Sequence, residues 1–157
     1  MDFQLDILIS KDDICKVDLS EQMVGWGEET FHQDPPKYEY DTKLVFEQFN
    51  NLEYYKKYYR EYLEDDLDID NYIALRLLGE DILDLELLIN NSQNISNNPA
   101  VLFLHELYKI ESFALFLIRD EEYIDERCRI NNDNDLIELV CNSLKWESPK
   151  GALITKA

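Results

Sequence analysis

The sequence predicts an α+β fold, in which helices pack on a small, mostly antiparallel sheet. Apolar and polar residues alternate near the N-terminus, which is the period of a half-buried strand. Apolar residues recur at three-to-four spacing in the middle of the chain, which is typical of amphipathic helices. With 157 residues, of which 45% are hydrophobic, the chain is long enough for one domain over residues 1–157. A mainly helical core with an N-terminal β-hairpin is the alternative.

Two short strands are expected at the N-terminus. Residues 3–9 alternate, a polar break follows at residues 11–13, and residues 14–19 alternate again, so a hairpin is the simplest interpretation. Glycines and prolines then punctuate residues 24–41, which we interpret as a surface loop with at most one short strand. This loop contains four large aromatic residues that we expect to pack onto the core rather than to form a contact surface. They are Trp26, Phe31, Tyr38 and Tyr40.

Residues 43–91 are interpreted as two helices joined at a cluster of aspartates. Asp41 and Thr42 are suitable N-caps for the first helix, and Asp70 is a suitable N-cap for the second. The buried side of the first helix would consist of Val45, Phe49, Leu52, Tyr59 and Leu63. The apolar side of the second would consist of Ile73, Leu77, Leu78, Ile82, Leu85, Leu88 and Ile89. Gly79 falls inside the second helix and weakens it by about 1 kcal/mol relative to alanine.

The C-terminal part of the chain predicts further helices and strands. Asn98 and Pro99 start a helix, because asparagine accepts from free amides and proline has no amide hydrogen to leave unpaired. The apolar run at residues 113–118 fits either an extension of that helix or a buried strand, and we favour the strand. Residues 119–130 are then a second strand or a short helix. A turn at residues 131–135 ends in a helix cap, a helix follows over residues 136–146, and residues 152–155 form an edge strand.

The charge of the chain indicates what it binds. Its formal net charge is -19, from 34 acidic and 15 basic residues. Nucleic acids and anionic membrane surfaces have the same sign and are disfavoured as direct ligands, whereas a cationic protein surface is favoured. Between residues 61 and 108, Arg76 is the only lysine or arginine. The helices therefore lack the basic neighbours that would normally neutralise such a surface.

The candidate binding residues lie in this acidic region. We expect the charge complementarity to come from Glu61, Glu64, Asp65, Asp66, Asp68 and Asp70. Adjacent tyrosines would act as the aromatic anchors of the contact, and these are Tyr58, Tyr59 and Tyr62. A second candidate patch consists of Glu80, Asp81, Asp84 and Glu86.

The sequence favours neither a metal site nor a cofactor site. Asp66, Asp68 and Asp70 match the first ligands of a calcium-binding EF-hand loop, but Asn71 and Leu77 stand where that loop requires glycine and glutamate. We therefore reject an EF-hand, although weak binding of divalent cations to the aspartates remains open. No residue pattern indicates a bound cofactor.

Catalytic motifs are also missing from the sequence, so we expect no enzyme activity. His32 and His105 have no second histidine or cysteine at metal-ligand spacing, and His105 with Glu106 is interpreted as a hydrogen-bonded pair at the edge of the core. Cys128 or Cys141 with a histidine would form a nucleophilic dyad, yet neither lies in a nucleophile turn.

The cysteines and the N-terminus indicate a cytoplasmic protein. Cys15, Cys128 and Cys141 are odd in number and widely spaced, so we expect reduced and mostly buried thiols. No apolar run reaches membrane-spanning length, and the first ten residues are acidic where a signal peptide would be basic.

Small size, acidic charge and the lack of a catalytic motif together resemble the small acidic bacterial toxin-immunity proteins of contact-dependent growth inhibition or bacteriocin systems. The resemblance is one of class and rests on properties of the whole chain. It implies a protein that binds and neutralises one cognate basic toxin domain, expected to be a nuclease. Two alternatives stay open: an acidic secretion chaperone, and a nucleic-acid mimic that inhibits a DNA-binding enzyme.

Overall fold

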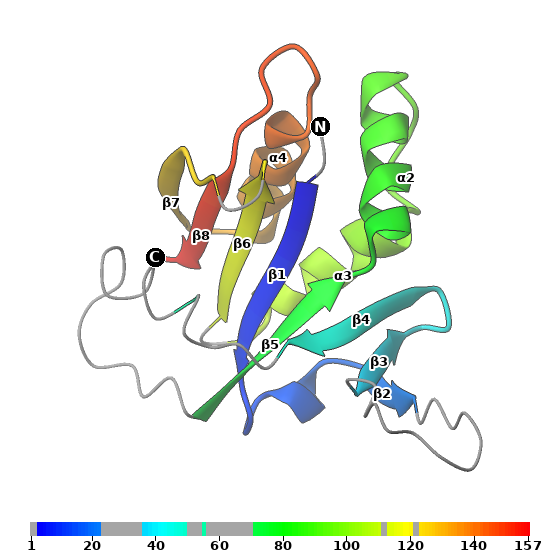
Figure 1. The fold of residues 1–157 in the computed structure, drawn as a ribbon, viewed down its shortest axis with the longest axis vertical. Coiled ribbons are helices and arrows are strands. Elements are labelled where there is room, and N and C mark those ends of the chain that lie inside the picture. Colours follow the sequence, from blue (N-terminus) through cyan, green and yellow to red (C-terminus); the bar gives the residue numbers. More distant parts are fainter. Residues whose placement is uncertain (1–2, 23–35, 50–54, 56–70, 111–112, 121–122) are drawn as a thin grey trace.

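The computed structural model describes residues 3–22, 36–49, 55, 71–110, 113–120 and 123–157, and in this part of the chain eight strands form one sheet (Figure 1). The strands are β1 (Phe3–Ser10), β2 (Leu19–Gln22), β3 (Lys37–Tyr40), β4 (Leu44–Phe49), β5 (Tyr72–Leu77), β6 (Phe113–Arg119), β7 (Glu126–Ile130) and β8 (Ala152–Lys156). The helices are α2 (Gly79–Asn90), α3 (Pro99–Tyr108), α4 (Asp133–Ser143) and the short 3-10 helix η1 (Ile14–Lys16). The fold is thus α+β, as predicted, but the sheet is much larger than the small sheet expected.

The strands follow the order β2-β3-β4-β5-β1-β6-β8-β7 across the sheet. Neighbouring strands are antiparallel except for the last pair, β7 and β8, which are parallel. Parallel neighbours need a crossover connection, and α4 supplies it between these two strands. The sheet is therefore mostly antiparallel, as the sequence predicted.

The three helices cover one face of the sheet (Figure 1). On that side, residues of β1 such as Leu5 and Ile7 pack in one cluster with Leu85 of α2, Leu104 of α3 and Val140 of α4. The other face is also buried at its centre, by a smaller cluster that consists of Leu8, Tyr55, Ala74, Ala114, Phe116, Ile118 and Leu153. Strands buried on both faces have nearly continuous apolar sequences, which explains residues 113–118 and 152–154.

The predicted N-terminal hairpin is wrong. β1 lies in the middle of the sheet between β5 and β6, whereas β2 pairs with β3 at one edge. β1 is also more than half-buried, because its even-numbered residues Asp6 and Leu8 are as inaccessible as the odd-numbered ones. The alternation in residues 3–9 identified the strand correctly, but it could not identify the neighbours of that strand.

The two central helices are also corrected. Residues 44–49 and 72–77 are the strands β4 and β5, which pair with each other. Asp41 and Thr42 are not N-caps, since they form the turn between β3 and β4 with φ angles of 48° and 56°. Gly79 begins α2 instead of interrupting it. Asp70 and residues 52, 59 and 63 lie outside the described part of the chain.

The C-terminal predictions are largely confirmed. The Asn98 side chain caps α3 by accepting from the amide of Ala100 at 2.9 Å, and Pro99 is the first helical residue. Residues 113–118 form a strand, and α4 begins after Asn132, which accepts from the amide of Asp135 at 2.8 Å. The strand at residues 152–155 exists, but it is not an edge strand, because β8 is flanked by β6 and β7.

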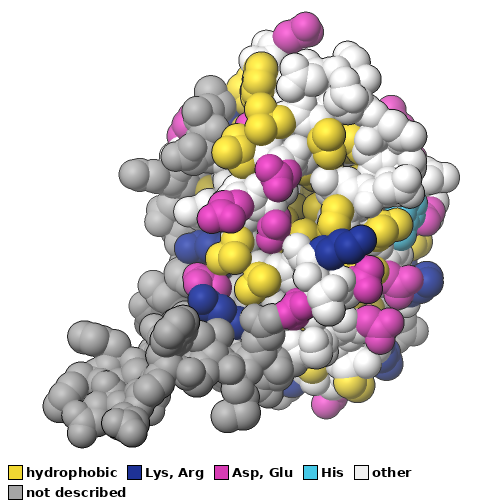
Figure 2. All heavy atoms as spheres, turned by 90° about the vertical axis from the view of Figure 1, so that its right-hand side faces the viewer, with side chains coloured by type: hydrophobic (Ala, Val, Ile, Leu, Met, Phe, Trp, Pro, Cys, Tyr) yellow, Lys and Arg dark blue, Asp and Glu magenta, His cyan; other side chains and the backbone are white. Residues whose placement is uncertain are grey.

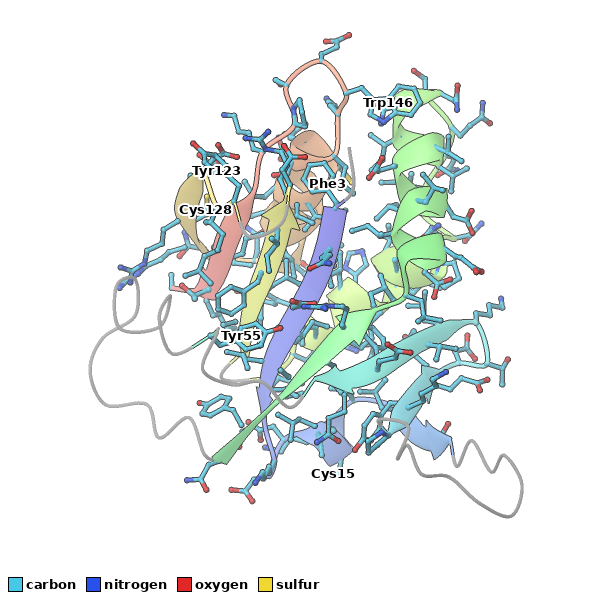
Figure 3. All side chains as sticks on the ribbon, viewed as in Figure 1. Phe3, Cys15, Tyr55, Tyr123, Cys128 and Trp146 are labelled. Atoms are coloured by element: carbon cyan, nitrogen blue, oxygen red, sulfur yellow. The ribbon has the colours of Figure 1, made fainter. Side chains whose placement is uncertain are left out.

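A row of charged residues crosses the sheet on the face opposite the helices. The paired positions are Lys37 with Glu47, Glu47 with Arg76, and Arg76 with Asp6. The row ends at Asp6, whose carboxylate is fully buried and accepts from Arg76 Nε at 2.8 Å and Nη2 at 3.0 Å. The hydroxyl of Tyr55 donates to the same carboxylate at 2.7 Å, and Figure 3 shows Tyr55 on this face. The buried carboxylate is therefore neutralised within the fold.

Burial and the Asp6 carboxylate shift the pKa values of Tyr55 and Arg76. The pKa of the Tyr55 hydroxyl is raised, first by burial and then by the negative charge of Asp6. The pKa of Arg76 is raised chiefly by its hydrogen bond to Asp6. Both groups consequently keep their protons at neutral pH, which is the state that holds the carboxylate.

Candidate functional site

The first candidate patch lies outside the described residues. It comprises the acids Glu61, Glu64, Asp65, Asp66, Asp68 and Asp70 together with the tyrosines Tyr58, Tyr59 and Tyr62. Tyr55 of the same segment is described, and its ring packs edge-on against Phe116 with the ring centroids 5.1 Å apart. The second candidate patch, on α2, is therefore the one whose geometry is known.

The four acids of α2 point in different directions. Glu80 and Asp84 are exposed, whereas Asp81 is half-buried and Glu86 is buried. Spaced four residues apart, Glu80 and Asp84 lie on one side of the helix. Glu80 belongs to the first turn, where the helix dipole favours a carboxylate, but Asp84 lies beyond that turn. The outward-facing part of the predicted patch is thus Glu80 with Asp84.

Asp81 and Glu86 have structural roles. A carboxylate oxygen of Asp81 accepts from the amide of Val45 at 3.4 Å, which joins α2 to β4. Partial burial raises the pKa of Asp81, the hydrogen bond to Val45 opposes that shift, and the charges of Asp84 and Glu80 add to it. A carboxylate oxygen of Glu86 accepts from the indole nitrogen of Trp146 at 3.3 Å.

Leu83 and Leu87 of the same helix are exposed near these acids, with 50% and 40% of their surfaces accessible. Figure 2 faces this side of the molecule, where hydrophobic and acidic side chains are interspersed over α2. Neither leucine belongs to the apolar side that periodicity predicted for this helix. The sequence analysis did not propose either leucine as a binding residue. Their position outside the predicted apolar side could have indicated that they are exposed.

Several of the described bases form ion pairs with acids outside α2. Lys16 pairs with Asp13, Lys109 with Glu106, and Arg119 with Asp120 and Asp125. Within the described residues, no lysine, arginine or histidine lies within ion-pair distance of Glu80 or Asp84. Among the described side chains, none therefore neutralises Glu80 or Asp84 through an ion pair.

The described histidine pairs differently from the prediction. His105 Nδ1 lies 2.8 Å from a carboxylate oxygen of Asp133, so its partner is not Glu106. This contact joins α3 to the N-terminal turn of α4, and the hydrogen bond to His105 is the main reason that the pKa of Asp133 is lowered. Within the described residues, no group of three histidines, cysteines, aspartates or glutamates could hold a metal ion.

A pocket of about 270 Å³ lies between β7 and α4, and Cys128 and Leu139 are among its lining residues. Burial and the neighbouring Glu126 raise the pKa of the Cys128 thiol. Little thiolate is therefore present at neutral pH, and the thiol is a weak nucleophile there. None of the three cysteines forms a disulfide. Mostly buried thiols were predicted, but Cys15 is exposed, and Cys128 and Cys141 are half-buried.

The thiols should differ in reactivity. Burial raises the pKa of Cys141 to about 11, so at pH 8 only about one molecule in a thousand has the thiolate at this position. We expect iodoacetamide to label exposed Cys15 first and Cys141 last, and the rate at Cys141 to rise about tenfold per pH unit up to its pKa. Peptide mapping by mass spectrometry at several pH values measures this. Equal labelling of the three cysteines in the folded protein would contradict it, and labelling in denaturant is the control.

Comparisons with known proteins give no relative for this chain. No protein-family model matches it, and no curated protein or solved structure is detectably similar. Among the described helices, none is both long and apolar enough to cross a membrane.

Proposed function

We propose that this chain binds a cationic protein domain and neutralises it, in the manner of the small acidic immunity proteins that bacteria pair with toxins. The observation that supports this best is the outer side of α2, where Glu80 and Asp84 are exposed beside two exposed leucines. Carboxylates next to accessible apolar side chains combine long-range attraction with surface that gains free energy on burial.

A basic toxin domain of the nuclease class suits this surface. A nuclease presents lysine and arginine to phosphate groups, and carboxylates can occupy the same positions and so block the approach of nucleic acid. With a net charge of -19, the chain also attracts such a domain from a distance. Association rates of about 10⁸ to 10⁹ per molar per second at low salt are typical of partners steered in this way.

Charge reversal tests the proposal. The tagged chain is purified from its native host at low and at high salt, and the dissociation constant of the recovered partner is measured by calorimetry. Two variants are compared: one combines Glu80→Lys with Asp84→Lys, and the other combines Asp65→Lys, Asp66→Lys and Asp68→Lys. We expect the variant that alters the true contact surface to bind about 100-fold more weakly or worse, because like charges then face each other.

The control variant is Asp12→Lys with Glu138→Lys. Both residues are exposed and lie away from α2, Asp12 in the turn after β1 and Glu138 on α4, and the change in net charge equals that of the α2 variant. This variant should lose affinity only because its smaller net charge weakens the long-range attraction. The loss should be a few-fold at low salt and should vanish at high salt, where that attraction is screened. The proposal fails if both acidic sets can be reversed without loss of affinity, or if the recovered partner is not basic.

A further inference from the structure

The exposed apolar residues of α2 form a ridge. Leu83 and Leu87 are four positions apart, which places them on one side of the helix and about 6 Å apart along its axis. The core-facing side of α2 consists of other residues, including Ile82 and Leu85, both of which are buried. The helix therefore has a second apolar side, on the outside of the molecule.

Trp146 extends this second side. Its backbone amide donates to the side-chain oxygen of Asn90 at 2.9 Å, and its indole nitrogen donates to Glu86 at 3.3 Å. Residues 83, 86, 87 and 90 follow the spacing of one helix stripe, so both bonds hold Trp146 on the side of α2 that also carries the two leucines. Figure 3 shows Trp146 next to the C-terminal end of α2. We call Leu83, Leu87 and Trp146 the α2 ridge.

The α2 ridge is exposed yet held in place. Trp146 has 57% of its surface accessible although two hydrogen bonds fix its position. The side chain of Asn90 also donates to the carbonyl oxygen of Leu144 at 3.0 Å, which fastens the chain leading to Trp146. A rigid aromatic side chain loses little conformational entropy on binding, so such an arrangement is well suited to anchoring a partner.

Charges flank the ridge on one side. Glu80 lies three residues before Leu83, and Asp84 lies three residues before Leu87, so each carboxylate neighbours a leucine on the helix surface. On the other side, Lys145 and Glu147 precede and follow Trp146, and their charges cancel. The surface thus offers an apolar row with a negative border along one edge.

We infer that the α2 ridge binds an amphipathic basic helix of the partner protein. This inference rests on the proposed function and specifies the element that is bound. Around Leu83 and Leu87 the backbone groups of α2 bond within the helix, so a partner contacts side chains there. Helices pack on such a ridge through apolar residues at three-to-four spacing. Lysines or arginines on one border of that helix would then face Glu80 and Asp84. A second copy of this chain is a poor occupant, because its own carboxylates would meet these acids.

A designed peptide tests the inference. The probe is a helix of about 18 leucine and lysine residues with the leucines in one stripe, and the control peptide has the same composition with the stripe scrambled. Calorimetry measures binding of both peptides to the full chain. We expect the striped peptide to bind at least about tenfold more tightly, and Leu83→Gln with Leu87→Gln to remove that difference, because the apolar contact is lost while every charge remains.

Leu102→Gln is the matched control, since Leu102 on α3 is exposed to a similar extent, 38%, and lies outside the ridge. It should leave the preference intact, and circular dichroism verifies that each variant is folded. Equal binding of both peptides, or a preference that survives the double substitution, overturns the inference. The proposed function would still stand in that case if charge reversal abolishes binding of the natural partner. A dimer in light scattering that the double substitution dissociates would assign the ridge to a second copy and overturn the inference as well.

Discussion

Replacing Asp6 with alanine is expected to lower the free energy of unfolding by about 3–5 kcal/mol. The Asp6 carboxylate is completely buried, and it accepts hydrogen bonds from two nitrogens of Arg76 and from the hydroxyl of Tyr55. Removal of one member of a buried ion pair leaves the other charge without its compensation in a poorly solvated place. Urea unfolding followed by circular dichroism measures the loss.

Glu47→Ala is the matched control for this substitution. Glu47 lies opposite Arg76 in the same row of charges, but it is only half-buried. Its Oε1 atom lies 3.7 Å from Nζ of Lys37. A partly solvated pair contributes less than about 1 kcal/mol, so this variant should unfold at nearly the wild-type urea concentration. If Asp6→Ala costs no more than Glu47→Ala, the hydrogen bonds of Asp6 to Arg76 and Tyr55 do not stabilise the fold as described. A double variant with Asp6→Leu and Arg76→Leu should recover part of the loss, because an apolar pair needs no compensation.

Local sequence signals predicted the C-terminal half of the fold well. Asn98 and Pro99 act within one helical turn, and the apolar run at residues 113–118 is as long as a typical buried strand. Each of these signals depends only on near neighbours in the chain. The start of α3 and the strand β6 were therefore accessible from the sequence alone.

The central strands were misread because two periods coincide there. In β4, Leu44 and Phe46 face the helices with the spacing of a strand, whereas Val45 and Phe49 also fit the spacing of a helix. In β5, apolar residues face both sides of the sheet, so the alternation that identifies a half-buried strand is weak. Only the pairing of β5 with β1 and β4 decides between the two interpretations, and that pairing joins residues far apart in the chain.

The candidate binding surface was predictable only in part. Arg76 is the only lysine or arginine from residue 61 to residue 108, which identified the acidic region, and Glu80 and Asp84 are indeed exposed there. Glu86 was expected beside them, but it is buried against Trp146, which lies 60 residues later in the chain. Helical periodicity gives the direction of a side chain, yet it contains no information on what packs against that side. The α2 ridge therefore became visible only from the structure.

Replacing Gly151 with alanine is expected to destabilise the protein by about 3 kcal/mol, the upper end of what overpacking usually costs. A Cβ atom at this position would overlap the carbonyl oxygen of Tyr123 and would lie 3.1 Å from the Cα atom of Ile124. Both are backbone atoms, so no side chain can rotate away. The overlap would also disturb the hydrogen bonds between residues 125 and 151, in which the Gly151 amide donates to Asp125 at 2.6 Å and its carbonyl accepts from the Asp125 amide at 2.9 Å.

Gly79→Ala is the control that separates this close approach from a general effect of losing a glycine. No atom lies within 4 Å of a Cβ built at Gly79, and the residue stands in the first turn of α2. Alanine there reduces the freedom of the unfolded chain and should leave stability unchanged or raise it by up to about 1 kcal/mol. Urea unfolding of both variants, with hydrogen exchange at β7 and β8, measures the contrast. Gly151 holds the entry to β8 against the entry to β7, so the exchange rates of these two strands should rise first, and equal stability of the two variants would refute this role.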